Sequence, residues 1–242
     1  MLLVKQSTTM TSFDNFFPSC VRAFTSDSAI DFTLQQYPNQ LAVNQQAYLK
    51  NQIGEASFVF YSAKQVHGNR VINLESAQFD NSVIEEADAV MTALDNVAVA
   101  VRTADCVPIF IYDTRRHVCA VVHAGWKGTQ LKIGPQTIYM MQDSYGSKAA
   151  DLTVVLGPCI RDCCYEVSDE FKNIFPDCVS VKGNRCCFNM AKENTAQLLL
   201  SGVAPGRIHD SHICTCCDTR YFSFRRQKEA AGRMVSVIIM KK

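Results

Sequence analysis

Three long apolar runs near the middle of the chain constrain its fold more than any other feature. The segments "VAVAVRT" (97–103), "VPIFIYD" (107–113) and "VCAVVHA" (118–124) are almost continuously apolar. Such strands are typical of a sheet covered on both faces, whereas a half-exposed strand alternates apolar and polar residues. A similar run, "RMVSVIIM", lies at 233–240. We therefore expect these four segments to form buried strands.

Segments with helical periodicity are interspersed among these strands. Gly54 is suited to end the first helix, since glycine tolerates the left-handed conformation of a C-cap, and Ser168 and Asn189 are suited to begin the last two. The predicted helices span 41–54, 134–146, 166–175 and 189–202, and further strands are predicted on either side of the turn "HGN" (67–69) and at 151–157. Several strands follow one another directly, without a strict strand–helix alternation. The pattern predicts a single-domain α/β (α+β) sandwich with a mixed sheet over residues 1–242.

The composition argues against several classes of partner. The formal net charge of this 242-residue chain is +1, so neither nucleic acid nor an anionic membrane is expected as its main partner. The apolar stretch in residues 1–13 is too short for a secretory signal, and no run has the length of a membrane span. Twelve cysteines without an export signal indicate a reducing cytoplasm and mostly free thiols.

His67, Cys106 and His123 all lie where the chain leaves a predicted strand, which is where functional groups gather. Imidazole and thiolate ligands suit zinc or copper, and three protein ligands with an open fourth position are typical of a catalytic zinc. The gaps between the three residues match no short metal motif, however. From the residues alone, structural histidines and a buried cysteine are the commoner explanation, and a nucleophilic pair of Cys106 with His123 or His67 fits the same residues as well as a metal site does.

Basic and acidic residues close to these positions suggest further roles. Arg102 precedes Cys106 by four positions, and Arg225 and Arg226 follow an aromatic stretch. A guanidinium group binds phosphate or carboxylate through two parallel hydrogen bonds, although an exposed, solvated basic face is the slightly preferred explanation for the arginine pair. Asp105 either orients a metal ligand or accepts hydrogen bonds in a turn, and the sequence does not distinguish these roles.

Two cysteine motifs are only weak evidence for a zinc site. In "GPCIRDCC" the spacing of Cys159 and Cys163 is one residue too long for a zinc nucleobase deaminase, and the His-x-Glu half of that motif is missing. "CTCC" (214–217) has a C-x-x-C spacing but no second pair at zinc-finger spacing, so a structural zinc ribbon is not expected.

Six segments, taken in order, resemble the YfiH family of laccase-domain proteins, also described as multicopper polyphenol oxidases. They are "KQVHGNRV", "ADAVMT", "VRTADCVPIFIYD", "VCAVVHAGWKGT", "LGPCIRDCCYEV" and "CTCCDTRYFSFRR". The resemblance implies an α/β sandwich similar to that of toxin-type cysteine hydrolases. It also implies a zinc site, with copper as the other possible metal, formed by His67, Cys106 and His123.

The same resemblance implies phosphorolysis of adenosine, inosine or methylthioadenosine to the free base and ribose 1-phosphate, with adenosine deamination as a side activity. The expected partners are thus a small nucleoside and phosphate. We assign catalytic roles to Cys106, His123 and Arg102, and substrate binding to Arg102 and Lys127. Lys127 stands where the family is expected to have arginine. Arg161 stands where glycine is usual, and this larger side chain could narrow the pocket.

Other functions remain open from the sequence. Copper-dependent oxidation of phenols is disfavoured, because five histidines are too few for a laccase's copper sites. A hydrolase with Cys106 as nucleophile, acting on an amide of a cell-wall precursor, uses the same residues. A non-enzymatic module that binds metal or changes thiol redox state would use the surplus cysteines instead.

Overall fold

The structure, a computed structural model, describes residues 10–34, 36–80 and 82–242. Residues 1–9, most of the stretch considered above for a secretory signal, lie outside the described residues. The apolar runs form β6 (Val97–Thr103), β7 (Val107–Asp113), β8 (Val118–Ala124) and β14 (Met234–Met240), and every residue of these strands is buried. The prediction of interior strands is therefore confirmed.

Two sheets contain these four strands. The five-stranded sheet has the order β1-β2-β14-β6-β3, in which only β3 and β6 are parallel. The six-stranded sheet has the order β13-β9-β7-β8-β5-β4, in which β13–β9 and β4–β5 are parallel and the other pairs antiparallel. The remaining strands of the two sheets are β1 (Met10–Ser12), β2 (Val21–Ser26), β3 (Val59–Tyr61), β4 (Val71–Asn73), β5 (Ala89–Thr92), β9 (Leu152–Leu156) and β13 (Ile208–Asp210).

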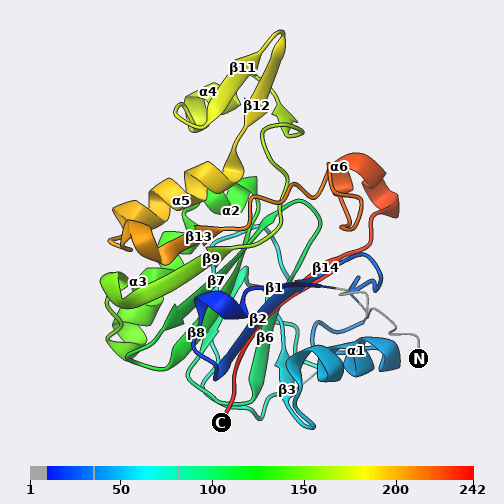
Figure 1. The fold of residues 1–242 in the computed structure, drawn as a ribbon, viewed down its shortest axis with the longest axis vertical. Helices are drawn as coiled ribbons and strands as arrows, with labels where there is room; N and C mark the ends of the chain where they lie inside the picture. Colours follow the sequence, from blue (N-terminus) through cyan, green and yellow to red (C-terminus); the bar gives the residue numbers. More distant parts are fainter. Residues whose placement is uncertain (1–9, 35, 81) are drawn as a thin grey trace, which may run out of the picture.

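The sheets stack face to face, and helices cover both outer faces (Figure 1). Alternate residues of β6 show this arrangement. Val97, Val99 and Val101 pack in the core between the sheets, whereas Ala98 and Ala100 pack with Leu49 and Ile53 of α1 (Val43–Ile53). On the other side, the six-stranded sheet packs against α2 (Trp126–Gln130), α3 (Ile133–Tyr145) and α5 (Met190–Leu200). The fold is a mixed α/β sandwich, as predicted.

The caps of two helices follow the sequence prediction. Gly54 ends α1 in the left-handed conformation with φ of 73°. Asn189 begins α5, and its side chain accepts a hydrogen bond from the Lys192 backbone N–H. The chain also contains α6 (Phe224–Gln227) and short 3-10 turns at Asp14–Phe16, Ala149–Asp151, Pro205–Arg207 and Lys228–Ala230. Among the described residues, no helix has the length and apolar character needed to cross a membrane.

The predicted helix over 166–175 is wrong in extent. Only α4 (Phe171–Ile174) is helical, and Ser168 provides no side-chain cap. The preceding residues instead form β10 (Glu166–Val167), which pairs with β12 (Arg185–Phe188), and β12 also pairs with β11 (Val179–Lys182). Pairing with a strand about twenty residues away thus overrides the local helical pattern. This third sheet and α4 project from one end of the sandwich (Figure 1).

Two connections carry the chain from the five-stranded sheet to the six-stranded sheet. One joins β3 to β4 and contains His67; the other joins β6 to β7 and contains Cys106. Both have a non-glycine residue in the left-handed region, His67 with φ of 59° and Asp105 with φ of 87°. Such conformations are uncommon for residues with a side chain and cluster at functional sites. The strands on either side of "HGN", β3 and β4, belong to different sheets.

Candidate metal centre and its cavity

His67, Cys106 and His123 converge at the rim of the sandwich. One donor atom from each side chain lies within 4.8 Å of the other two, and the Cys106 sulfur is 4.0 Å from Nε2 of His67. The two imidazole rings are nearly perpendicular, with centroids 4.8 Å apart. His123 is buried on β8, whereas His67 is exposed and Cys106 is half-buried. The structure thus brings together the three predicted ligands, although their role as ligands stays a prediction.

Asp88 is the functional residue that the sequence reasoning missed. Its fully buried carboxylate accepts a hydrogen bond from Nδ1 of His123 at 2.7 Å. The same carboxylate accepts backbone N–H bonds from His67 at 2.9 Å and Gly68 at 2.6 Å. It therefore orients the imidazole with Nε2 toward the centre and also fixes the loop that carries the other imidazole. The available signal was an aspartate inside the apolar segment "ADAVMT" (87–92).

Gly125 makes room for this arrangement. A Cβ atom at this position would lie 2.8 Å from Cδ2 of His67 and 3.1 Å from the sulfur of Cys106. The first of these distances is closer than carbon atoms pack without displacement. The glycine in "HAGW" is therefore required by the close approach of two donor side chains, not by its own backbone conformation.

The charges of the donor groups are coupled. Burial raises the pKa of the Cys106 thiol, but the imidazoles of His123 and His67 outweigh it and lower this pKa to about 6. Burial lowers the pKa of His123, but Cys106 and Asp88 outweigh it and raise this pKa to about 9. In the absence of a metal ion, the pair is thus a thiolate and an imidazolium at neutral pH, and a bound cation would replace the proton.

The donor set fits a zinc ion. A tetrahedral zinc with Zn–N of about 2.0 Å and Zn–S of about 2.3 Å needs nitrogen and sulfur donors roughly 3.5 Å apart, and the 4.0 Å between Cys106 and His67 is close to this value. Three protein donors leave one tetrahedral position for a further ligand. Copper accepts the same donor types, so the geometry indicates a transition metal without selecting between the two.

Asp105 holds the connection that carries Cys106. Its carboxylate accepts hydrogen bonds from Oγ1 of Thr215 at 2.7 Å, Oγ of Ser223 at 3.1 Å and the backbone N–H of Arg225 at 2.6 Å. Of the two roles that the sequence left open, the structure supports the acceptor of loop hydrogen bonds. These bonds bring the segment 215–225 to the edge of the centre.

A cavity of about 770 Å³ opens beside the three donor residues. This volume is within the range of small-molecule sites in proteins. Aromatic and basic side chains make up much of its wall: Trp126, Tyr165, Phe224, Lys64, Arg102, Arg225, Lys228 and Arg233. Arg225 lies over the Tyr165 ring at 5.3 Å and donates to the carbonyl of Glu166 at 2.9 Å. A larger hollow of about 860 Å³, beside α1, has no histidine or cysteine in its described wall.

The structure also shows where the basic residues singled out in the sequence lie relative to this cavity. Arg102 is in its wall, but its buried guanidinium donates to the carbonyl of Phe32, Oγ of Ser62 and the carbonyl of Pro38. These contacts hold the backbone at Phe32 and at Pro38, so phosphate binding by Arg102 stays a prediction that the geometry does not favour.

Lys127 is outside the described wall of the cavity, with its ammonium group 5.5 Å from the centroid of the Trp126 ring. Its role in substrate binding also stays a prediction. The guanidinium of Arg161 forms an ion pair with Asp210 and is outside the described wall of the cavity, so the geometry does not favour a narrowing of the pocket by Arg161, which stays a prediction.

A two-sheet α/β sandwich with a His/Cys/His donor set beside an aromatic and basic cavity defines a small-molecule site that can hold a transition metal. The model of the family described as multi-copper polyphenol oxidoreductase laccase matches residues 25–241, and the chain belongs to this family. The structure of the hypothetical protein YfiH from Bacillus licheniformis has a TM-score of 0.84 with 25% identity, and the comparison covers 98% of both chains.

Two relatives carry names that describe an activity. A purine nucleoside phosphorylase from Clostridium acetobutylicum is 36% identical over 183 residues, which are 74% of this chain and 75% of the relative. Adenosine deaminase RL5, from an unknown prokaryotic organism, is 31% identical over 170 residues, which are 66% of this chain and 64% of the relative. Both activities are those of the named proteins.

Proposed function

We propose that this protein is a zinc-dependent purine nucleoside phosphorylase with adenosine deaminase side activity. The proposed substrates are adenosine, inosine and methylthioadenosine, each with phosphate. The observation that carries the proposal is a His67/Cys106/His123 donor set beside a cavity with both aromatic and basic walls. The names of the two relatives support the same substrate class.

The walls of the cavity suit the two parts of this reaction. In phosphorolysis a phosphate oxygen forms a bond to C1′ of the ribose, the bond from C1′ to the purine nitrogen breaks, and the base leaves with a proton. Trp126, Tyr165 and Phe224 offer faces for stacking a purine, while Arg225 and Lys228 offer positive charge for the phosphate. Placing the phosphate beside the ribose lowers the entropy cost of bringing the two reactants together.

His67, Cys106 and His123 would hold the zinc ion. When bound, zinc supplies a Lewis acid at its open position, where it can polarise a phosphate oxygen for phosphorolysis or a water for attack on C6 of adenine. Asp88 holds His123 in the required orientation, and Asp105 fixes the connection that presents Cys106. One site thereby accommodates both proposed reactions.

The test is product analysis with adenosine, with and without phosphate. We expect adenine and ribose 1-phosphate only when phosphate is present, and both are lost in His123→Ala. His212→Ala is the matched control, because His212 is an exposed histidine outside the cavity wall, and it retains activity. Inosine as the sole product with zinc-loaded protein would favour deamination as the main activity. Unchanged adenosine, inosine and methylthioadenosine would refute the proposal.

A second candidate is a hydrolase with Cys106 as nucleophile, acting on an amide of a cell-wall precursor. The observation that favours it is the lowered pKa of Cys106 beside His123, whose ring is oriented by Asp88, an arrangement that resembles a Cys–His–Asp triad. Metal-free protein would then hydrolyse the amide and lose this activity on alkylation of Cys106. Activity that depends on added zinc would exclude this mechanism.

Copper-dependent oxidation of phenols remains the third candidate, because it matches the family's description. The whole chain has five histidines, and the donor set beside the cavity contains two. A laccase needs several copper ions with mostly histidine ligands. Copper bound at the single donor set would oxidise phenols slowly at most, and oxidation of a phenol by copper-loaded protein tests this.

A further inference from the structure

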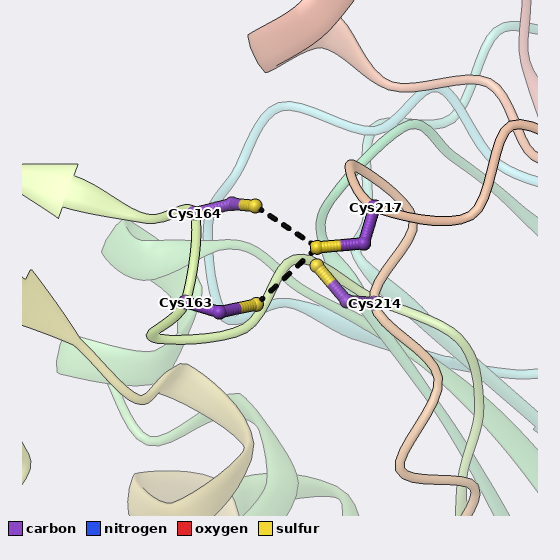
Figure 2. Close-up of side chains that lie close together, drawn as sticks. All are labelled: Cys163, Cys164, Cys214 and Cys217. Atoms are coloured by element: carbon purple, nitrogen blue, oxygen red, sulfur yellow. Dashed lines mark hydrogen bonds between the residues drawn. The ribbon is translucent and has the colours of Figure 1, made fainter.

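Four cysteine side chains from two distant segments converge away from the His/Cys/His set. Cys163 and Cys164 lie in the turn after β9, and Cys214 and Cys217 lie in the loop before α6 (Figure 2). All four sulfur atoms lie within 4.8 Å of one another. Figure 2 shows the side chains of the two segments pointing toward one another. The C-x-x-C spacing noted in the sequence therefore does have a partner pair, made of adjacent residues.

The distances suit four thiolates around one metal ion. The sulfur of Cys217 is 3.6 Å from that of Cys163 and 3.3 Å from that of Cys164. A tetrahedral zinc with Zn–S bonds of about 2.3 Å has sulfur atoms about 3.8 Å apart. The observed separations are near this value, and all four thiols are free in the structure.

The loop that carries Cys214 and Cys217 is held in place by contacts outside the four sulfurs. Nη1 of Arg226 donates at 2.8 Å to the carbonyls of Thr215 and Cys216. This half of the site is thus formed before any ion binds.

Two basic side chains interact with the cluster, and each is also paired with an aspartate. The guanidinium of Arg161 interacts electrostatically with Cys214, and the ammonium of Lys182 interacts with Cys163. Lys182 is held there by a 2.8 Å ion pair with Asp162. A zinc ion with four thiolates has a net charge of −2, which nearby cations stabilise.

We propose that Cys163, Cys164, Cys214 and Cys217 form a second, structural zinc site. Four thiolates with tetrahedral spacing select zinc or iron among the common metals, and four protein ligands leave no open position for a substrate. The site joins two segments 53 residues apart, measured from Cys164 to Cys217. Both segments supply cavity wall, Ile160 and Tyr165 from the first and Phe224 and Arg225 from the second. The zinc would therefore fix the relative position of two sides of the cavity.

The test counts metal ions per chain in protein produced with zinc, using elemental analysis. We expect two zinc ions in the wild type, one in Cys106→Ser and one in the double variant Cys163→Ser/Cys217→Ser. The control Cys20→Ser removes a half-buried thiol outside the cluster and retains two. X-ray absorption of the Cys106→Ser protein is expected to show only sulfur neighbours, at about 2.3 Å from zinc.

This last measurement uses a chain whose four-cysteine cluster is intact, so it decides the question even if the double variant does not fold. Zinc with nitrogen neighbours, or no zinc at all, in Cys106→Ser protein would overturn the proposal. So would iron in place of zinc, or a disulfide between the two segments in protein purified under reducing conditions. Failure of the nucleoside assay leaves the metal count unaffected, so the two proposals fail separately.

Discussion

Replacing Asp88 with asparagine tests whether a buried carboxylate organises the centre. The side chain keeps its shape, but an NH2 group replaces one acceptor oxygen. Oδ1 accepts from the His123 ring (2.7 Å) and the His67 N–H (2.9 Å), and Oδ2 accepts from the N–H groups of Gly68 (2.6 Å) and Val66 (3.3 Å). In either orientation of the amide, two donors face a group that cannot accept. At about 1–3 kcal/mol for each buried unsatisfied donor, the free energy of unfolding falls by roughly 2–6 kcal/mol.

Zinc affinity reports the same change at the centre. Loss of a carboxylate that orients a ligand histidine typically weakens metal binding by about 10- to 100-fold, measured here by competition with a chromophoric chelator and paired with urea unfolding of the metal-free protein. The matched control is Asp95→Asn, since Asp95 pairs with Nε2 of His117 at 2.7 Å in a partly exposed position. Zinc affinity within twofold of the wild type for Asp88→Asn would refute the assignment of Asp88 as the orienting group.

Three further perturbations test other parts of the structure. Gly125→Ala places a methyl group 3.1 Å from the Cys106 sulfur. We expect the zinc affinity, measured by competition with a chelator, to fall by about tenfold or more, while the circular dichroism spectrum stays that of the folded protein. Arg102→Met leaves the Phe32 carbonyl and Oγ of Ser62 without their buried donor, while the Pro38 carbonyl keeps its bond from Ser62, and it lowers the free energy of unfolding by about 2–6 kcal/mol, measured in urea. Burial raises the pKa of Asp210, but Arg161 outweighs it and lowers this pKa. The ion pair therefore contributes its full stabilisation above the unfolded-state pKa of about 3.9, and this stabilisation is lost as the pH falls below that value and through the lower pKa of the folded state. The stability difference between wild type and Asp210→Asn should shrink below about pH 4, and a constant difference would contradict this account.

The extent to which the fold could be predicted depends on how local each signal is. The buried strands β6, β7, β8 and β14 follow from continuous apolar runs, and Gly54 and Asn189 mark helix ends through backbone chemistry that involves only neighbouring residues. Sheet membership is different, because β3 and β4 are close in sequence but pair in separate sheets. Nothing in their composition records that choice, which is made by packing between distant strands.

The same distinction applies to the centre. The positions of His67, Cys106 and His123 at strand ends identified them as candidates, but their proximity needs the full topology of both sheets. Asp88 was missed although it lies in the quoted segment "ADAVMT", because its partners are backbone N–H groups and one ring nitrogen from other parts of the chain, which the segment itself does not reveal. For Arg102, the charge suggested phosphate, whereas its three acceptors come from segments up to 70 residues away.

The two connections from the five-stranded to the six-stranded sheet have a consequence for how the centre responds to changes elsewhere. His67 lies on one of them and Cys106 on the other, so an ion bound by both joins the two points where the chain passes from the first sheet to the second. Any ion that binds only the folded chain stabilises it, by about 4 kcal/mol at a thousandfold excess over its dissociation constant. Metal occupancy and packing between the sheets are therefore linked equilibria. A cavity made at Phe110, in the core between the sheets, is expected to weaken metal binding, and removal of the metal is expected to loosen that core.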